Sequence, residues 1–329
     1  MEQSLILLLL DQKTGTGGVP LPVASDAEAW KCLPRADKGA GQPLPAWARV
    51  LARALPRTTA AMLELDYLQR TRSPLDPKLR ARMRWVAAHA NRCAYSEAYA
   101  AADLRRAGVD DAGIRALARG DAKLPRPEEV ALEFARKMTV AANTVTDAEV
   151  GQLVRLYGQK QVVAMVLLLA YANFQDRFIL SLNVPLETGG PLKPLEVRFA
   201  RKEAGRQQAA APKRRPPAGK TIFSTKPAAD REWTSLDFAQ LQKAIEEQRA
   251  RQPRIAVPSW EDVRKHLPPG YPKDRPLRIR WSLVCLGYQP ELAAGWSACM
   301  RAFGQESRQD RAFEESVFWV ITRSLQCFY

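Results

Sequence analysis

The sequence has few residues of the kinds that build metal centres or disulfide frameworks. It contains five cysteines and two histidines in 329 residues. The cysteines are scattered and no two have CxxC spacing, so neither a disulfide scaffold nor structural zinc is favoured. Two histidines are too few for a His-rich metal site, and they give no basis for a Ser-His-Asp arrangement. We therefore expect no metal and no cofactor.

Long hydrophobic runs are also lacking. The longest, Val162 to Ala172, is about half of the roughly 20 residues that a spanning helix needs, and it is typical of a helix buried on all sides. The run from Leu5 to Leu10 is too short for a secretory signal, and Glu2 stands where such a signal carries positive charge. We expect no membrane span and a cytoplasmic protein.

The net charge of +15 raises the question of nucleic-acid binding. Much of the excess lies in one segment, because residues 193–231 hold eleven Lys or Arg against three acidic residues, together with prolines and few large apolar side chains. This composition indicates a basic linker rather than a folded domain that reads bases. Specific nucleic-acid recognition is therefore not favoured. Non-specific binding would fall steeply with salt and would be lost with this segment.

Apolar residues recur at helical spacing along most of the chain, and nothing between residues 45 and 185 alternates as a strand does. The sequence predicts an all-α fold. Asp76 is placed to cap a helix that begins at Pro77, and Thr146 with Glu149 forms a capping box. Gly108 and Gly158 are placed to end helices. Four parts follow from composition: an irregular arm (1–43), a helical domain (44–190), a basic Pro-rich linker (191–232) and a second helical domain (233–329).

One pattern occurs twice. Trp85-Val86 is followed after six residues by Cys93 and then by Tyr95, and Trp319-Val320 is followed at the same spacings by Cys327 and Tyr329. Trp and Cys are rare residue types, so their shared spacing indicates a repeat in which a helix with Trp on its packing face leads into a cysteine. The alternative is two unrelated buried helices that each end in a small thiol.

The residues around the first cysteine allow a family to be named. The segment from Asp76 through the helix to Asn91, followed by Arg92-Cys93-Ala94-Tyr95-Ser96, resembles the part of alkylhydroperoxidase D-like and carboxymuconolactone decarboxylase-like proteins that carries E-x11-C-x-x-C-x3-H. The stretch Asn173 to Pro185 resembles the closing helix of that family and its exit. The resemblance covers roughly residues 45–187, and a truncated second copy covers about 277–329.

The resemblance implies a helical domain that forms homo-oligomers and reduces small hydroperoxides at the expense of a thiol or dithiol reductant. In that family the second cysteine attacks the peroxide, the first resolves the sulfenic acid, and Glu and His relay protons. The first copy departs from this pattern. Cys93 occupies the resolving position, but Ser96, Ala100 and Ala81 stand at the attacking, His and Glu positions. Serine cannot form a sulfenic acid, so this copy cannot run the two-cysteine cycle.

Two roles remain open in the first copy. His89 lies one helical turn before Cys93, so it could act as a substitute base, or it could be a buried or capping histidine. Cys93 is a candidate catalytic residue, and the alternative is a small packed side chain. We interpret this copy as a packing or dimerising domain.

The second copy keeps one more feature of the family. Glu315 lies twelve residues before Cys327, which is the family spacing of the relay glutamate, and the two are the candidate acid–base group and thiol. The alternative is that Glu315 only faces solvent. Because the sequence ends at Tyr329, one residue before the attacking cysteine would stand, we expect it to be a fragment of a longer protein; a natural stop codon after Tyr329 would contradict this.

The sequence thus predicts two related alkylhydroperoxidase D-like helical domains, the second incomplete, and a thiol-dependent hydroperoxide reductase whose active copy is C-terminal. A lactone decarboxylase is less favoured. The competing class is a non-catalytic helical oligomerisation or interaction protein in which both cysteines are core residues.

Overall fold

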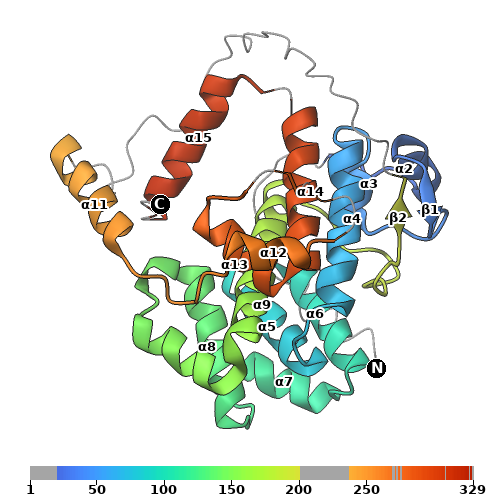
Figure 1. Ribbon diagram of the computed structural model, residues 1–329. Coiled ribbons are helices and arrows are strands. Elements are labelled where there is room, and N and C mark those ends of the chain that lie inside the picture. Colours follow the sequence, from blue (N-terminus) through green and yellow to red (C-terminus); the bar gives the residue numbers. More distant parts are fainter. Residues whose placement is uncertain are drawn as a thin grey trace.

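The computed structural model describes residues 21–200 and 237–327, except 269–270, 272, 275, 308 and 326. Within these residues the fold is all-α, as the sequence predicts, and strands are confined to two short segments (Figure 1). The elements of the first part are α2 (Asp26–Cys32), β1 (Ala36–Lys38), α3 (Ala46–Leu51), α4 (Pro56–Thr71), α5 (Pro77–Ala90), α6 (Ala94–Arg106), α7 (Asp111–Arg119), α8 (Arg126–Val140), the 3-10 turn η1 (Ala142–Thr144), α9 (Asp147–Ser181) and β2 (Arg198–Phe199).

The second part is also helical. Its elements are α11 (Phe238–Ala250), α12 (Trp260–Lys265), α13 (Arg280–Tyr288), α14 (Pro290–Glu306) and α15 (Arg311–Ser324). The basic linker predicted over 191–232 lies largely outside the described residues, which stop at 200 and resume at 237.

The arm predicted to be irregular over residues 1–43 differs from the structure where it is described. Residues 26–32 form α2, which begins with a complete capping box between Ser25 and Glu28. β1 pairs antiparallel with β2, so that Ala36 lies opposite Phe199. The arm is therefore held against the segment that follows α9. Residues 1–20 lie outside the described part of the chain.

The helix boundaries follow the capping residues. Asp76 accepts hydrogen bonds from the backbone N–H groups of Lys78 and Leu79, and Thr146 with Glu149 completes a capping box at α9. Gly158 interrupts α9 with φ 75°, a left-handed conformation that glycine adopts readily. The two helical halves of α9 therefore meet at the break predicted from the sequence.

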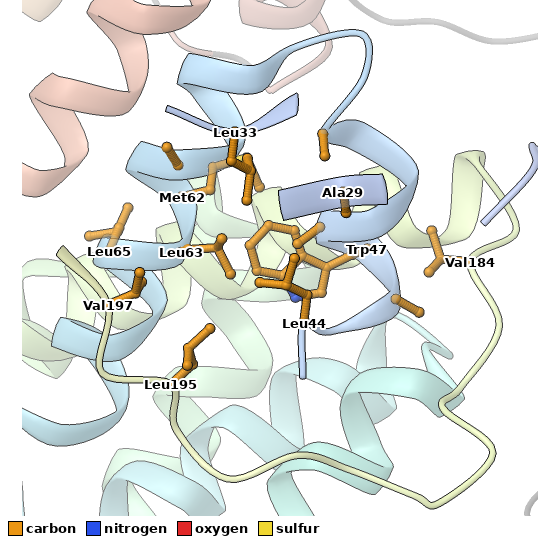
Figure 2. Packing of buried hydrophobic residues seen from close by; sticks show 14 of the residues in the cluster. Ala29, Leu33, Leu44, Trp47, Met62, Leu63, Leu65, Val184, Leu195 and Val197 are labelled. Carbon is orange, nitrogen blue, oxygen red and sulfur yellow. The ribbon is translucent and has the colours of Figure 1, made fainter. Parts of the chain in front are cut away.

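The main hydrophobic cluster joins the N-terminal segment to α4 and to the end of α9. Figure 2 shows the Trp47 ring surrounded by Leu44, Leu63 and other aliphatic side chains. Trp47 is 1% exposed. A second cluster fills the space between α5, α8 and α9. α9 is the helix of the described residues with the length and apolar content of a membrane span, but 67% of its apolar window is buried inside the protein. Its hydrophobicity is accounted for by these two clusters.

The helices that follow the linker pack on the first part of the chain. α14 runs beside α4, where Gly295 faces the Leu65 and Leu68 side chains (Figure 1). The Glu306 carboxylate at the end of α14 accepts hydrogen bonds from the backbone N–H groups of Arg57 (2.7 Å) and Thr58 (2.8 Å) and so caps α4. Helices on both sides of the predicted linker therefore share one core, while the division of the chain at 191–232 stays a prediction.

The helix that carries the second Trp-Cys pattern is not buried in the same way as the first. Trp85 in α5 is 5% exposed, whereas Trp319 in α15 is 51% exposed. The expectation that Trp319 lies on a packing face is therefore wrong for this chain. The other large apolar side chains of α15 are also exposed: Phe313, Val317, Phe318, Val320 and Ile321.

Candidate functional site

Helices α5 and α6 form a hairpin around the first cysteine. Asp76 and Pro77 start α5, which ends at Ala90, and Arg92 then takes a left-handed backbone conformation (φ 56°). The Cys93 N–H donates to the Ala88 carbonyl (2.9 Å), which closes the turn, and α6 begins at the next residue. The two helices therefore lie against each other with the motif positions on facing sides.

The motif positions of the hairpin meet at a cavity of about 40 Å³ between α4, α5, α6 and α9. Ala81, Ser96 and Ala100 all line it. These are the positions that the resemblance assigns to the relay glutamate, the attacking cysteine and the relay histidine. The cavity of the first copy thus has methyl groups and a hydroxyl where the redox chemistry of the family requires a carboxylate, an imidazole and a thiol.

Cys93 is fully buried. Its Sγ lies 3.4 Å from the Ser96 Oγ, and it forms no disulfide with the other cysteines that the structure describes. Burial and the negative charge of Asp176 raise the pKa of the Cys93 thiol, and hydrogen bonding with Ser96 offsets only part of this. Because the thiolate is the nucleophilic form, the structure favours a packed thiol over the catalytic role.

An interior ion pair between Arg84 and Asp176 contacts the motif position Ser96. The Arg84 guanidinium donates to both carboxylate oxygens of Asp176, at 2.6 Å and 3.1 Å, and also to the Ser96 hydroxyl (2.8 Å) and the Gln175 side chain (3.0 Å). Asn91 donates to the same carboxylate (2.9 Å). Burial alone would lower the pKa of Arg84, but the charge and hydrogen bonds of Asp176 raise it, so the guanidinium stays protonated. This network holds Ser96 as a hydrogen-bond acceptor.

His89 is not positioned as a general base for Cys93. Its Nδ1 lies 3.2 Å from the Glu97 carboxylate, and its ring stacks on Trp85 with a centroid distance of 4.7 Å. Burial raises the pKa of Glu97, although the neighbouring His89 lowers it in part. The expectation of a substitute base for Cys93 is therefore replaced by a His–Glu contact at the outer face of the hairpin.

Cys327 is an exposed thiol that follows α15. Its N–H donates to the Thr322 carbonyl (2.9 Å), the same five-residue backbone bond that Cys93 makes with Ala88. The two helices thus end in the same way at their cysteines. Within the described residues, this backbone hydrogen bond is a feature that both copies of the predicted repeat have.

Glu315 is not brought to Cys327. It lies in the second turn of α15, and the helix continues to Ser324, about 14 Å further along its axis. The carboxylate forms an exposed ion pair with Arg311 (3.1 Å). Glu315 cannot take a proton from Cys327 in this arrangement, so the structure corrects the predicted pairing and agrees with the alternative of a residue that faces solvent.

No sequence pattern indicates the polar groups that lie near the motif positions in place of the catalytic residues of the family. Arg84 and Asp176 are separated by 92 positions, and both lie on helices whose apolar stripes dominate the pattern. The one feature of the sequence that could indicate this ion pair is the presence of an arginine and an aspartate within two otherwise apolar helical segments. No group of three or more His, Cys, Asp or Glu suited to a metal ion occurs within the part of the chain that the structure describes.

One comparison finds a match, and it covers the segment that contains the α5–α6 hairpin. The model of the Carboxymuconolactone decarboxylase family matches residues 56–136, which span α4 to most of α8 and about a quarter of the chain. This segment is therefore similar to the carboxymuconolactone decarboxylase family, and the predicted resemblance is confirmed for the first copy. The match does not extend to the second copy. No curated protein and no solved structure matches the chain.

Proposed function

We propose that this chain is a thiol-dependent hydroperoxide reductase whose reactive thiol is Cys327 and whose first family copy is not catalytic. The observation that supports it is the contrast between the two motif cysteines: Cys327 is exposed, whereas Cys93 is buried. The family that matches residues 56–136 includes peroxidases of the alkylhydroperoxidase D-like type as well as other members. The match therefore supports the class of chemistry but does not indicate the substrate.

Burial separates the thiols of the described residues into two groups. Burial raises the pKa of Cys285 to about 11 and that of Cys299 to about 12, and it raises the pKa of Cys93 as well. These thiols stay protonated at neutral pH, and those of Cys93 and Cys299 are also shielded from solvent, while Cys285 is half-buried. Cys32 and Cys327 are exposed. Of these two, Cys327 stands at the motif position, which makes Cys32 a matched control.

The reaction needs one protein thiol and an external reductant. The Cys327 thiolate attacks the distal oxygen of ROOH, the O–O bond breaks, and the alkoxide takes a proton to leave as ROH, with Cys327 oxidised to a sulfenic acid. A first thiol of the reductant displaces water and forms a mixed disulfide with Cys327. A second thiol then releases the Cys327 thiol and leaves as the oxidised disulfide. The small hydroperoxide and the thiol or dithiol reductant are the proposed partners.

The test is consumption of cumene hydroperoxide by the full chain with dithiothreitol as reductant. We expect wild-type protein, Cys32→Ser and Cys93→Ser to consume it at similar rates, and Cys327→Ser to fall to the rate of the protein-free control. A Cys327→Ser variant as active as Cys32→Ser would overturn the assignment.

The second candidate is a non-catalytic helical interaction protein. The position of Glu315 favours it, because the relay carboxylate of the family is paired with Arg311 and is remote from the thiol. In that case wild-type protein consumes no hydroperoxide above the protein-free control. Homo-oligomerisation and a cytoplasmic location belong to both candidates and stay predictions.

A further inference from the structure

The cavity at the motif positions of the first copy has polar groups that the proposed thiol chemistry does not use. Its apolar lining includes Trp47, Ala81, Ala100 and Leu168. Its polar lining includes Gln69, Arg80 and Tyr99, together with the ion-paired side chains of Asp66, Arg70, Arg84 and Asp103. The two alanines leave space at the positions where the family has larger catalytic side chains. A cavity of about 40 Å³ holds a molecule of a few heavy atoms or a small number of waters.

Two of these polar groups are buried without a partner. The Gln69 side chain is 3% exposed as a residue, and its Oε1 accepts no hydrogen bond from the described residues. The Tyr99 hydroxyl is also buried and makes no hydrogen bond of good geometry with the described residues, although the Tyr95 hydroxyl and the Glu187 carboxylate lie near it. Buried polar atoms in proteins are nearly always satisfied, by protein, water or a ligand. The lining therefore offers one acceptor, the Gln69 Oε1, and one hydroxyl, that of Tyr99, to a molecule in the cavity.

The third polar group is the Arg80 guanidinium, which forms no salt bridge with the residues that the structure describes. Arg70 is held by Asp103 (2.9 Å) and Asp66 (3.4 Å), and Arg84 is held by Asp176 (2.6 Å). The Arg80 guanidinium forms no ion pair or hydrogen bond with the side chains that the structure describes. Burial lowers the pKa of Arg80, and the charge of nearby Asp103 offsets this only in part. An anion in the cavity would supply the missing partner.

We propose that this cavity binds a small 2-hydroxy carboxylate, with the carboxylate on Arg80 and the hydroxyl donating to the Gln69 Oε1. The Tyr99 hydroxyl donates to a second ligand oxygen, and the methyl groups of Ala81 and Ala100 bound the space beside the ligand. This ligand class supplies acceptors for the donors of Arg80 and Tyr99 and a donor for the Gln69 Oε1. A neutral hydroperoxide would leave Arg80 unpaired, and a simple carboxylate would leave Gln69 unpaired.

The test uses isothermal titration calorimetry of the full chain with three compounds of similar size. Glycolate carries both groups, propionate lacks the hydroxyl, and glycolamide lacks the charge. We expect glycolate to bind with one site per chain, propionate to bind about tenfold more weakly because Gln69 stays unpaired, and glycolamide to give no saturable binding. Equal affinity for glycolate and propionate would overturn the hydroxyl contact, and binding of none of the three would leave only water in the cavity and overturn the proposal.

Variants assign the contacts. Gln69→Leu should weaken glycolate about tenfold and leave propionate unchanged, and Arg80→Gln should abolish binding of both. Arg115→Gln is the matched control, because Arg115 is exposed on α7 and does not line the cavity. Glycolate binding that survives Arg80→Gln contradicts the proposal. Should Arg80→Gln fail to fold, Gln69→Leu with the three compounds still decides it. Cys327→Ser should bind glycolate like wild type, so this outcome is independent of the proposed peroxidase activity.

Discussion

Arg84 and Asp176 form a two-point ion pair in the protein interior, with donor–acceptor distances of 2.6 Å and 3.1 Å. The Asp176 side chain is completely buried and that of Arg84 is 13% exposed. The pair joins α5 to α9 and positions Ser96 through a further hydrogen bond from Arg84. It lies directly behind the position at which the family places its attacking cysteine.

Removal of one partner should therefore be costly. Asp176→Asn leaves a buried guanidinium without its counter-charge, and we expect the free energy of unfolding to fall by about 3–5 kcal/mol. Urea denaturation followed by circular dichroism measures this. Asp121→Asn removes the carboxylate of an exposed pair with Arg119 and should cost less than about 1 kcal/mol. A similar small cost for Asp176→Asn would contradict the structural role of the pair.

The Glu306 cap couples the C-terminal helices to the first part of the chain. Its carboxylate accepts from the N–H groups of Arg57 and Thr58 and from the Thr58 hydroxyl (2.7 Å). Glu306→Ala leaves these donors at the start of α4 unpaired, so stability should fall by about 1–2 kcal/mol. Glu247→Ala, on the exposed side of α11, is the control and should change it by no more than about 0.5 kcal/mol. Equal effects of the two variants would show that the cap does not hold α14 to α4.

The capping box of α9 predicts a pH dependence. Hydrogen bonds from Lys137 and from the Thr146 backbone and hydroxyl lower the pKa of Glu149 from 4.5 to about 2. A lowered pKa in the folded state adds stability that is present above pH 4.5 and is lost as the pH falls toward 2. Glu149→Gln keeps an acceptor but does not titrate. Its deficit in urea midpoint relative to wild type should thus be largest above pH 4.5 and shrink toward pH 2; a deficit that is constant with pH would contradict the pKa shift.

The Cys93–Ser96 geometry predicts the result of restoring a second sulfur. The two side-chain atoms are 3.4 Å apart, so Ser96→Cys should form a disulfide with Cys93 on treatment with diamide. It should not reduce cumene hydroperoxide when combined with Cys327→Ser, because Ala81 and Ala100 supply no proton relay. Loss of free thiol, measured with a chromogenic disulfide, reports the bond, and Ser96→Ala is the control. Peroxidase activity of the double variant would contradict the account of the first copy.

The sequence predicted the parts of the fold that depend on local chemistry. Asp76 and Thr146 cap helices because their side-chain oxygens reach N–H groups two or three residues away, and Gly158 breaks α9 because it tolerates positive φ. The hairpin around Cys93 was recognisable for the same reason, since its residues are close in sequence.

Contacts between distant residues were not predictable in this way. The packing of α14 on α4 brings Glu306 to Thr58 across 248 positions, and the buried pair joins Arg84 to Asp176 across 92. Glu315 and Cys327 have the family spacing but do not meet, because spacing along the chain does not by itself bring two side chains together. In the first copy the positions fifteen and nineteen residues along from Ala81 meet it only because α6 folds back on α5, and no described helix does this for α15.

The most direct test of the account is the site of oxidation after one exposure of the full chain to hydrogen peroxide. Dimedone traps sulfenic acids, and peptide mass spectrometry identifies the cysteine that carries it. The account predicts the adduct on Cys327, with Cys93, Cys285 and Cys299 unmodified until the protein is unfolded. An adduct on native Cys93, with Cys327 unmodified, would contradict it.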